Sequence, residues 1–232
     1  MKLPLIIAEI GNCHEGSLEV ALELVSLAKE AGADLVKFQA GRAEGFSRTA
    51  DDIERYRKYE LSLEGYWKLA EFARSIEIEP FFSVWNEEFN VLLDFPQMWR
   101  KIPSRQCERS VIARFSNLRT FISIPHWFTE DQVRNLNIGE GIPLHCVTEY
   151  PAIDPMLNRI IKIKDWTGLR TGYSDHTIGI ESAISAVKDA GAIVIEKHFT
   201  KAHDFGPLRD HALAATPLEL ANLIKAVKFD PE

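Results

Sequence analysis

Two histidines, His176 and His198, each stand near the end of a short apolar segment, two residues after another polar side chain. Ser174 precedes the first and Glu196 precedes the second. Residues two apart on an extended strand share a face, so each histidine and its polar partner would point the same way. Either histidine alone could be a core residue whose ring is satisfied by a backbone carbonyl. As a pair on neighbouring strands they could hold one divalent ion, and we predict a metal site here.

Charged side chains occupy similar positions in the earlier apolar segments. Glu9 ends the first segment, Lys37 and Gln39 share a face in the second, and Lys101 lies in the fourth. Burying a charge without a partner costs several kcal/mol, so folding alone does not explain such a set. Glu9, or Asp175 beside His176, could supply an oxygen to the metal or orient an imidazole ring.

The two lysines admit two interpretations. One could form a Schiff base with its substrate, as in metal-free aldolases, with the other as its neighbour. Alternatively, Lys37 and Lys101 together receive a substrate that carries a phosphate and a carboxylate. We favour the second interpretation because a Schiff-base mechanism has no use for a metal site. Hydroxyl groups that could donate hydrogen bonds to such an anion lie at further segment ends: Ser83, Ser104, Ser123, Thr148, Tyr150 and Ser174.

The remaining histidines are predicted to have other roles. His145 has the opposite parity to Thr148 and Tyr150, so we expect it to pack against a helix. Four histidines fall in loops, where we expect surface or substrate-loop residues rather than metal ligands: His14, His126, His203 and His211.

Apolar runs of strand length alternate with segments of helical period along the whole chain, which is typical of parallel βα units. The pattern predicts a single domain over residues 1–232, a (β/α)8 TIM barrel, with the polar residues above at the carboxyl ends of its strands. An open doubly wound sheet is the alternative, but Gly11–Gly16 lacks the GxGxxG spacing of a dinucleotide-binding turn. The predicted strands are Leu5–Ile10, Leu35–Ala40, Pro80–Trp85, Met98–Ser104, Thr120–Pro125, Leu144–Tyr150, Arg170–His176 and Ile193–Thr200.

Helix signals fill most of the gaps between these strands. Ser17 is a predicted N-cap, and Leu18, Leu22, Val25 and Ala28 would form the apolar stripe of the helix that follows it. That helix should stop at Gly32, and the string Lys29–Ala33 is echoed late in the chain by Lys188–Ala192. The segment Gly41–Leu61, rich in Arg, Asp and Glu, is predicted to be a long loop over the mouth of the barrel.

The composition is that of an ordinary globular protein. Of 232 residues, 46% are hydrophobic and 26% are charged, and 27 Lys and Arg face 34 Asp and Glu, a net charge of −7. We therefore expect no nucleic-acid partner, and the first apolar run is too short for a signal peptide or a membrane span. Three scattered cysteines without metal-binding spacing favour a reducing compartment, the cytoplasm.

Five stretches carry the most distinctive patterns of the chain: Ile7–Gly11, His14–Gly16, Ala31–Gln39, Gly172–Thr177 and Glu196–Thr200. Together they resemble the sialic acid synthase (N-acetylneuraminate synthase) family. Members of that family are (β/α)8 barrels that condense phosphoenolpyruvate with an N-acetylmannosamine-type sugar, using a divalent metal, usually Mn²⁺ or Mg²⁺. The resemblance implies a transferase that makes a sialic-acid-like 3-deoxy-2-ulosonic acid and phosphate. C3 of phosphoenolpyruvate would attack an aldehyde polarised by the metal, water would add at C2, and phosphate would leave by C–O cleavage.

The resemblance also implies a role for each matching residue. His176 and His198 would be the metal ligands, Gln39 would lie beside the acceptor and the metal, and Asp210 would hold hydroxyl groups of the acceptor. The expected catalytic residues are Glu9, Glu196 and Lys37. The expected substrate-binding residues are Lys37, Gln39, Ser83, Lys101, Ser104, Ser123, Thr148, Tyr150, Ser174 and Asp210.

The sequence departs from the family pattern at several positions. Gln106 stands where the family has a glutamate, so acid–base work would fall to Glu9 or Glu149. Cys13 and Thr148 each stand where the family has an asparagine, and the loop around Asp210 is longer than usual. The chain ends at Glu232, so we expect no antifreeze-like domain after the barrel.

Two other functions stay open from the sequence. The same barrel could be a metal-dependent aldolase or lyase that cleaves a keto acid to pyruvate. It could also be a catalytically weak sugar-acid-binding module that needs a separate partner chain. Family members pair as dimers, so a homodimer is possible.

Overall fold

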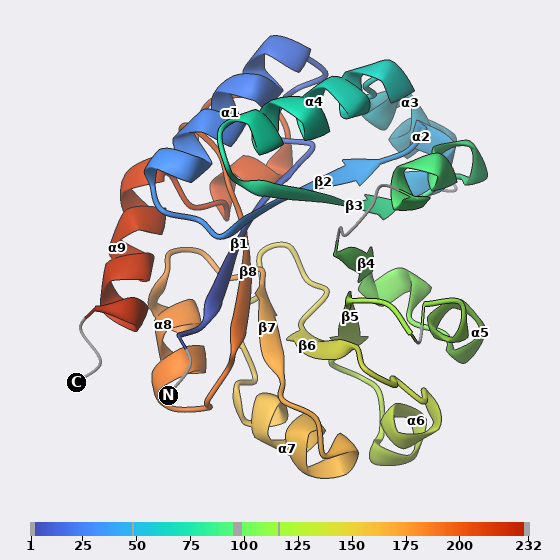
Figure 1. Ribbon diagram of the computed structural model, residues 1–232, viewed down its shortest axis with the longest axis vertical. Helices are drawn as coiled ribbons and strands as arrows, with labels where there is room; N and C mark the ends of the chain where they lie inside the picture. Colours follow the sequence, from blue (N-terminus) through green and yellow to red (C-terminus); the bar gives the residue numbers. More distant parts are fainter. Residues whose placement is uncertain (1–2, 48, 95–98, 116, 230–232) are drawn as a thin grey trace.

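Eight parallel strands close into a barrel in chain order, from β1 beside β8 round to β7 (Figure 1). The computed structural model describes residues 3–47, 49–94, 99–115 and 117–229. The predicted (β/α)8 fold is confirmed and the open doubly wound sheet is excluded. The strands are β1 Leu5–Gly11, β2 Leu35–Ala40, β3 Glu79–Val84, β4 Arg100–Ile102, β5 Thr120–Pro125, β6 Ile142–Cys146, β7 Gly172–Asp175 and β8 Val194–His198.

Several predicted strands are too long. The predicted sixth strand ran to Tyr150, but β6 ends at Cys146, and Thr148 and Tyr150 lie in the turn that follows. The predicted fourth strand ran from Met98, which lies outside the described residues, to Ser104; β4 ends at Ile102, and Ser104 opens a short 3₁₀ helix after Pro103.

Helices surround the ring of strands, as Figure 1 shows. The α-helices are α1 Leu18–Glu30, α2 Ala43–Phe46, α3 Ala50–Arg57, α4 Leu63–Ser75, α5 Arg109–Ala113, α6 Glu130–Asn135, α7 Asn158–Thr167, α8 Glu181–Lys188 and α9 Pro217–Lys228. Three 3₁₀ helices complete the set: η1 Glu87–Asp94, η2 Ser104–Gln106 and η3 Arg209–Ala212.

Helix α1 begins and ends where the sequence signals placed it. The hydroxyl of Ser17 accepts a hydrogen bond from the amide of Val20 at 3.3 Å, and Gly32 follows the helix with a φ of +92°. Gly191 takes the same left-handed conformation after α8, as the echoed string predicted. The predicted apolar stripe is rotated, because Leu18 and Leu22 are only half-buried. The buried face consists of Ala21, Leu24, Val25 and Ala28.

The segment Gly41–Leu61 is not a simple loop, so that prediction is wrong. It contains α2 and α3, and the hydroxyl of Thr49 caps α3 by accepting from the amide of Asp52. Its charged residues pair with one another: Arg57 contacts Glu44 at 2.8 Å. Charges that resembled a solvated loop therefore belong to the outer surface of two short helices.

The inside of the barrel changes character along its axis. Phe81 and Phe121 pack with ring centroids 5.5 Å apart, one on β3 and one on β5. Two residues further along the same strands, the inward positions carry Ser83 and Ser123. Because side chains alternate along a strand, the interior is apolar at the amino ends and polar at the carboxyl ends. The packed apolar side chains at the amino ends form the floor of the barrel interior, and the polar side chains at the carboxyl ends form its mouth.

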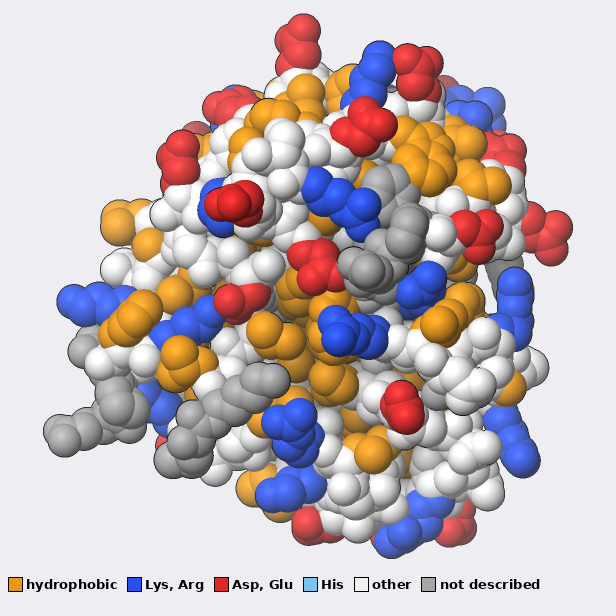
Figure 2. Space-filling model, viewed as in Figure 1, with side chains coloured by type: hydrophobic (Ala, Val, Ile, Leu, Met, Phe, Trp, Pro, Cys, Tyr) orange, Lys and Arg blue, Asp and Glu red, His pale blue; other side chains and the backbone are white. Residues whose placement is uncertain are grey.

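Charges of both signs are interspersed on the surface. Figure 2 shows Lys and Arg side chains lying among Asp and Glu side chains over the face in view. Within the described ranges, no helix has the length and apolar character needed to cross a lipid bilayer.

Asp34 joins the first two strands to the last helix. Its Oδ2 accepts from the amide of Ile6 at 2.7 Å, and Lys228 of α9 donates to both carboxylate oxygens at 2.7 and 2.8 Å. The amide of Asp34 also donates to the carbonyl of Ile6 at 2.9 Å.

We expect Asp34→Ala to lower the free energy of unfolding by about 1–3 kcal/mol, because the amide of Ile6 loses its acceptor. Lys228→Met removes only the ion pair and should cost less, about 0–1 kcal/mol. Chemical unfolding of both variants measures the difference. Equal losses would mean that the contact with Ile6 contributes nothing.

Candidate active site

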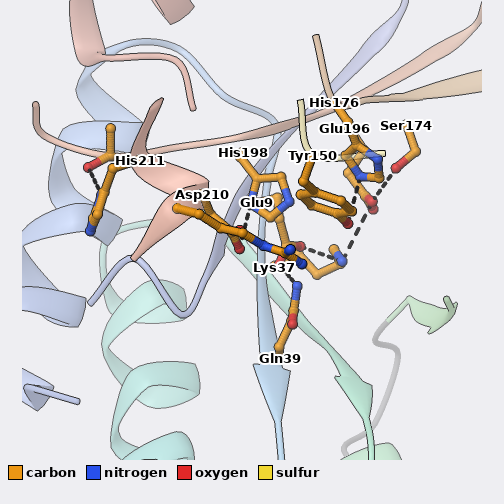
Figure 3. A network of polar contacts seen from close by, with 12 residues as sticks. Glu9, Lys37, Gln39, Tyr150, Ser174, His176, Glu196, His198, Asp210 and His211 are labelled. Atoms are coloured by element: carbon orange, nitrogen blue, oxygen red, sulfur yellow. Dashed lines mark hydrogen bonds and ion pairs between the residues drawn. The ribbon is translucent and has the colours of Figure 1, made fainter. Parts of the chain in front are cut away.

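A cavity of about 200 Å³ opens at the carboxyl ends of the strands. The fourteen residues expected to be catalytic, substrate-binding or metal-ligating by resemblance to the family line it. They are Glu9, Lys37, Gln39, Ser83, Lys101, Ser104, Ser123, Thr148, Tyr150, Ser174, His176, Glu196, His198 and Asp210. Figure 3 labels residues of this region, and Glu9, Tyr150, His176, Glu196 and His198 lie close together in it.

Glu196 is the centre of one buried charge network. Its Oε1 lies 2.6 Å from the ammonium group of Lys101 and 3.6 Å from that of Lys37, and the hydroxyl of Ser174 donates to it at 2.9 Å. Burial alone would raise the pKa of Glu196, but Lys101 and Lys37 outweigh that effect and lower it to about 2. The carboxylate is therefore charged at any physiological pH.

Glu9 is the second buried carboxylate. It forms an ion pair with Lys37, and the amide of Gln39 donates to its Oε1 at 3.2 Å. Register explains the pair, since Glu9 lies directly opposite Lys37 where β1 meets β2. Burial lowers the pKa of Lys37 to about 7, against the attraction of Glu196. Each of the two lysines is thus in contact with a carboxylate.

The two imidazoles lie side by side above this network. The ring centroids of His176 and His198 are 5.6 Å apart. The carbonyl of Val147 accepts a hydrogen bond from Nδ1 of His176, so Nδ1 carries the proton. Nε2 of His176 then accepts from the hydroxyl of Tyr150 at 3.0 Å. Burial lowers the pKa of His176 to about 4, and it also lowers the pKa of His198, so both rings are neutral at neutral pH.

These rings suit a divalent metal ion. A metal ligand must be a neutral imidazole, and the carbonyl of Val147 on Nδ1 of His176 fixes the tautomer with a lone pair on Nε2. That lone pair accepts from Tyr150 here and would bind the ion once the hydroxyl of Tyr150 moves away. Nδ1 of His198 is buried without a hydrogen-bond partner. Over the described ranges, no three His, Cys, Asp or Glu side chains are grouped to hold an ion. Two imidazoles with open positions are therefore what the protein offers.

Asp175 does not reach the imidazoles, contrary to one suggestion from the sequence. Its Oδ2 accepts from Lys197 at 2.9 Å, and its Oδ1 accepts from the amide and the hydroxyl of Thr177 at 2.8 Å each. Lys197 also donates to the carbonyl of Thr177. This ion pair is fully buried and fixes the turn that carries His176.

The predicted hydroxyl groups reach the cavity from four sides. The hydroxyl of Ser123 is buried without a partner, and that of Ser83 makes only a long contact of 3.4 Å with the carbonyl of Phe38. Ser104 and Thr148 reach the cavity from turns rather than strands. The hydroxyls of Ser123 and Ser83 can therefore donate to a ligand without breaking a short hydrogen bond.

Asp210 stands at the edge of the imidazole pair, with its Oδ2 4.0 Å from Nδ1 of His198. Burial raises the pKa of Asp210, against the effect of Arg209. The neighbouring His211 lies between Glu15, whose Oε1 is 2.9 Å from Nε2, and Thr200, whose hydroxyl is 2.7 Å from Nδ1. These contacts hold the loop that carries Asp210.

The predictions for the other histidines are confirmed in part. His14 and His211 are buried, which excludes the surface alternative for them and leaves the substrate-loop alternative. His203 is exposed, as predicted. His145 lies outside the cavity, as its parity predicted, but it stacks on Tyr173 with centroids 5.7 Å apart.

Gln106, which replaces the family's glutamate, and Glu149 both lie outside the cavity. Glu149, one of the two carboxylates expected to take over acid–base work, is exposed and does not line the cavity. The amide of Gln106 donates to the carbonyl of Val84 at 3.2 Å, outside the cavity. Glu9 is therefore the carboxylate of the expected pair that faces the site.

Sequence reasoning missed part of the wall. Cys146 has the same parity as Thr148 and Tyr150, so the alternation pattern contained the signal for it. Phe46 and Tyr56 come from the segment that was interpreted as a loop. The remaining missed residues follow strand ends or lie in turns: Asn12, Trp85, Pro103, Arg105 and Arg209.

The model of the NeuB family matches residues 24–119 and 129–229 of this chain. The chain belongs to the NeuB family. It is 32% identical to the N,N'-diacetyllegionaminic acid synthase of Legionella pneumophila over 96% of its own length and 71% of that protein. It is 29% identical to the N-acetylneuraminate-9-phosphate synthase of Homo sapiens over 97% of its length and 69% of that protein.

A solved NeuB-type structure has the same architecture. The N-acetylneuraminic acid (sialic acid) synthetase of Leptospira borgpetersenii, crystallised with citrate, superposes with a TM-score of 0.88 and 28% identity. The alignment covers 98% of this chain and 83% of that one. The expected resemblance is confirmed, and this member of the NeuB family is an enzyme of the synthase type, a transferase.

Two buried histidines outside the imidazole pair, His14 and His145, should make the stability of the fold depend on pH. Burial lowers the pKa of each from 6.5 to about 4. The unfolded chain therefore binds protons below about pH 6.5 that the folded chain refuses, and the free energy of unfolding falls as the pH drops toward 4. Each ring adds a slope of up to about 1.4 kcal/mol per pH unit.

Urea unfolding between pH 7.5 and 5 measures this dependence. His145→Gln should flatten the profile, whereas His203→Gln, at an exposed site, should leave the slope unchanged. A parent profile that is flat over this range would contradict the assignment.

Proposed function

We propose that this enzyme condenses phosphoenolpyruvate with the aldehyde form of an amino sugar, such as N-acetylmannosamine or a relative, in a reaction that depends on Mn²⁺ or Mg²⁺. The products are a sialic-acid-like 3-deoxy-2-ulosonic acid and phosphate. The observation that carries the proposal is the meeting of two buried lysines with two neutral imidazoles in one cavity of a NeuB-family barrel.

The part of the cavity nearest the barrel core, where the two lysines lie, suits phosphoenolpyruvate. Lys37 and Lys101 supply positive charge, and the hydroxyls of Ser83, Ser123 and Ser174 supply neutral donors around them. A phosphate and a carboxylate need several such donors at once. When the substrate binds, its anionic groups take contacts with the lysines that Glu9 and Glu196 otherwise hold.

His176 and His198 would hold the divalent ion. Such an ion, when bound, acts as a Lewis acid toward the aldehyde oxygen of the acceptor. The carbonyl of Val147 fixes the orientation of the His176 ring through Nδ1, and the hydroxyl of Tyr150, which donates to Nε2 in this structure, would give up that contact to the ion. Asp210, beside His198, is placed to accept hydrogen bonds from acceptor hydroxyls.

The chemistry needs three changes of bonding. C3 of phosphoenolpyruvate forms the bond to the aldehyde carbon, water adds to C2, and the C–O bond to phosphate breaks as the C2 ketone forms. The attacking water gives up both of its protons as its oxygen becomes the ketone oxygen: the aldehyde oxygen gains one, and the departing phosphate takes the other. Lys37, whose pKa burial lowers to about 7, and Glu9, in contact with it, are placed to carry a proton between these positions.

The activity assay combines the protein with phosphoenolpyruvate, N-acetylmannosamine and Mn²⁺. We expect phosphate release that requires both the acceptor and the metal, together with a 2-keto-3-deoxy acid detected by its periodate product. Cleavage of the sialic acid to pyruvate without any phosphoenolpyruvate-dependent synthesis would instead identify the aldolase alternative and contradict the proposal.

Lys37→Met should weaken the binding of phosphoenolpyruvate by more than about tenfold, because a charge-assisted contact is lost. Calorimetric titration measures the dissociation constant. Lys68→Met is the matched control, since Lys68 is also ion-paired, to Glu64, but lies on the outer surface of α4. The double variant Glu9→Gln/Lys37→Met removes both charges if the single variant unfolds. An unchanged dissociation constant would remove Lys37 from the site.

His176→Ala should abolish retention of Mn²⁺, as measured by elemental analysis after gel filtration, with the circular dichroism spectrum unchanged. The exposed His203 provides the control, since His203→Ala should keep the metal content of the parent. Full metal occupancy in the His176 variant would refute the ligand assignment.

A further inference from the structure

Two arginines reach the cavity above the lysines and imidazoles, and the reaction proposed above gives neither of them a role. Arg105 comes from η2, just after β4, and Arg209 comes from η3, after β8. Both line the same cavity although their elements are more than a hundred residues apart in the chain.

Aromatic rings orient both guanidinium groups. Arg209 lies over the ring of Tyr150, 5.0 Å from its centroid. Arg105 lies over Trp85 at 4.7 Å and donates to the carbonyl of Phe46 at 2.8 Å. A cation held against a ring face is directed before a ligand arrives, so less side-chain entropy is lost on binding.

The arginines also lie on the same side of the cavity as Asp210. Arg209 is 3.7 Å from Oδ1 of Asp210, and both arginines act electrostatically on that carboxylate. Arg105 and Arg209 both act on Tyr150 as well, one by charge and one by direct contact. Tyr150 in turn stacks on His176 with centroids 4.1 Å apart.

Positive and negative side chains do not balance in the part of the cavity wall that contains the two arginines. Deeper down, Lys37 and Lys101 are each matched by a carboxylate, Glu9 or Glu196. Near the mouth, Asp210 is the lining carboxylate beside two guanidinium groups. The lining residues therefore leave an excess of positive charge at the mouth rather than at the floor.

The position of the two arginines along the barrel axis indicates that their positive charge faces the acceptor and not phosphoenolpyruvate. His176 and His198 stand two residues beyond Ser174 and Glu196, about 6 to 7 Å nearer the mouth along their strands. The arginines follow strand ends and so lie at the level of the imidazoles or above. A ligand that reacts at the imidazoles and extends outward passes between them, whereas phosphoenolpyruvate beside Lys101 lies below.

We propose that Arg105 and Arg209 form an anion subsite at the mouth of the cavity, and that the preferred acceptor sugar carries an oxyanion, a phosphate ester or a carboxylate, at the end away from its aldehyde. This inference rests on the proposed condensation and names its acceptor class. Guanidinium groups match such oxyanions because they donate two parallel hydrogen bonds.

The test compares kcat/KM for three acceptors under saturating phosphoenolpyruvate and Mn²⁺: N-acetylmannosamine, its 6-phosphate and the corresponding 6-carboxylate. We expect the parent enzyme to prefer one or both anionic acceptors by about tenfold or more. The ratio between the phosphate and the carboxylate identifies which oxyanion the subsite takes.

Arg105→Gln and Arg209→Gln should each lower kcat/KM for the anionic acceptor by about 10- to 100-fold, a much larger loss than for the neutral acceptor, and the KM for phosphoenolpyruvate should change least. Arg209→Lys should restore part of the preference, because it keeps the charge and loses the paired donors. Arg57→Gln is the matched control: Arg57 is 57% exposed against 56% for Arg209, and it pairs with Glu44 away from the cavity wall.

Two kinetic results would overturn the proposal. The first is a parent enzyme that prefers the neutral sugar. The second is a set of variants that raise the KM for phosphoenolpyruvate and leave the acceptor preference intact, which would assign the arginines to that substrate.

Direct binding separates this proposal from the proposed function. If no acceptor is turned over, the condensation fails, but titration calorimetry with the 6-phosphate and the neutral sugar still reports on the subsite. Tighter binding of the 6-phosphate that Arg209→Gln removes would support the subsite, and equal binding of the two sugars would reject it.

Discussion

Four charged side chains neutralise one another inside the barrel, and the site depends on that mutual arrangement. Glu9, Lys37, Lys101 and Glu196 come from β1, β2, β4 and β8, and each is 5% exposed or less. The contact between Lys101 and Glu196 joins strands that are not neighbours in the ring. Since an unpaired buried charge costs several kcal/mol, the barrel closes around each of these groups at low cost only when its partner is also in place. Closure of the fold and assembly of the site are therefore one event.

The same arrangement determines how an anion can enter. Because the four charges cancel, the floor of the cavity attracts a substrate only if the substrate's own oxyanions replace a carboxylate as a partner of the lysines. Glu196, with a pKa lowered to about 2, keeps its charge throughout, whereas Lys37, with a pKa lowered to about 7, can change charge near neutrality. The lysine is thus the group of this network whose protonation a bound substrate can set.

Much of the fold, and of the site deep in the barrel, could be predicted because side chains on a strand alternate between its two faces. Alternation alone placed His176 and His198 on one side and His145 on the other, and register then paired Ser174 with Glu196. Strand ends were less predictable, since Thr148 and Tyr150 read as strand but lie in a turn. The pattern also could not show that Asp175 faces outward and pairs with Lys197. The sequence does not reveal whether two charges on neighbouring strands are buried together, because their burial depends on the helices packed outside the strands.

The residues that line the mouth of the cavity could not be predicted from local sequence patterns. Phe46 and Tyr56 belong to helices whose charged surface resembles a solvated loop, and Arg105 and Arg209 lie in 3₁₀ helices too short to show a periodic pattern. What brings them together is the closed ring, which sets the turn after β4 and the turn after β8 over one opening. The four buried charges lie on strands, whereas Arg105 and Arg209 lie beyond strand ends and contact none of the four, so these two arginines can change without disturbing that network. The acceptor, which enters through the turns, is therefore where specificity can change while the buried charge network stays fixed.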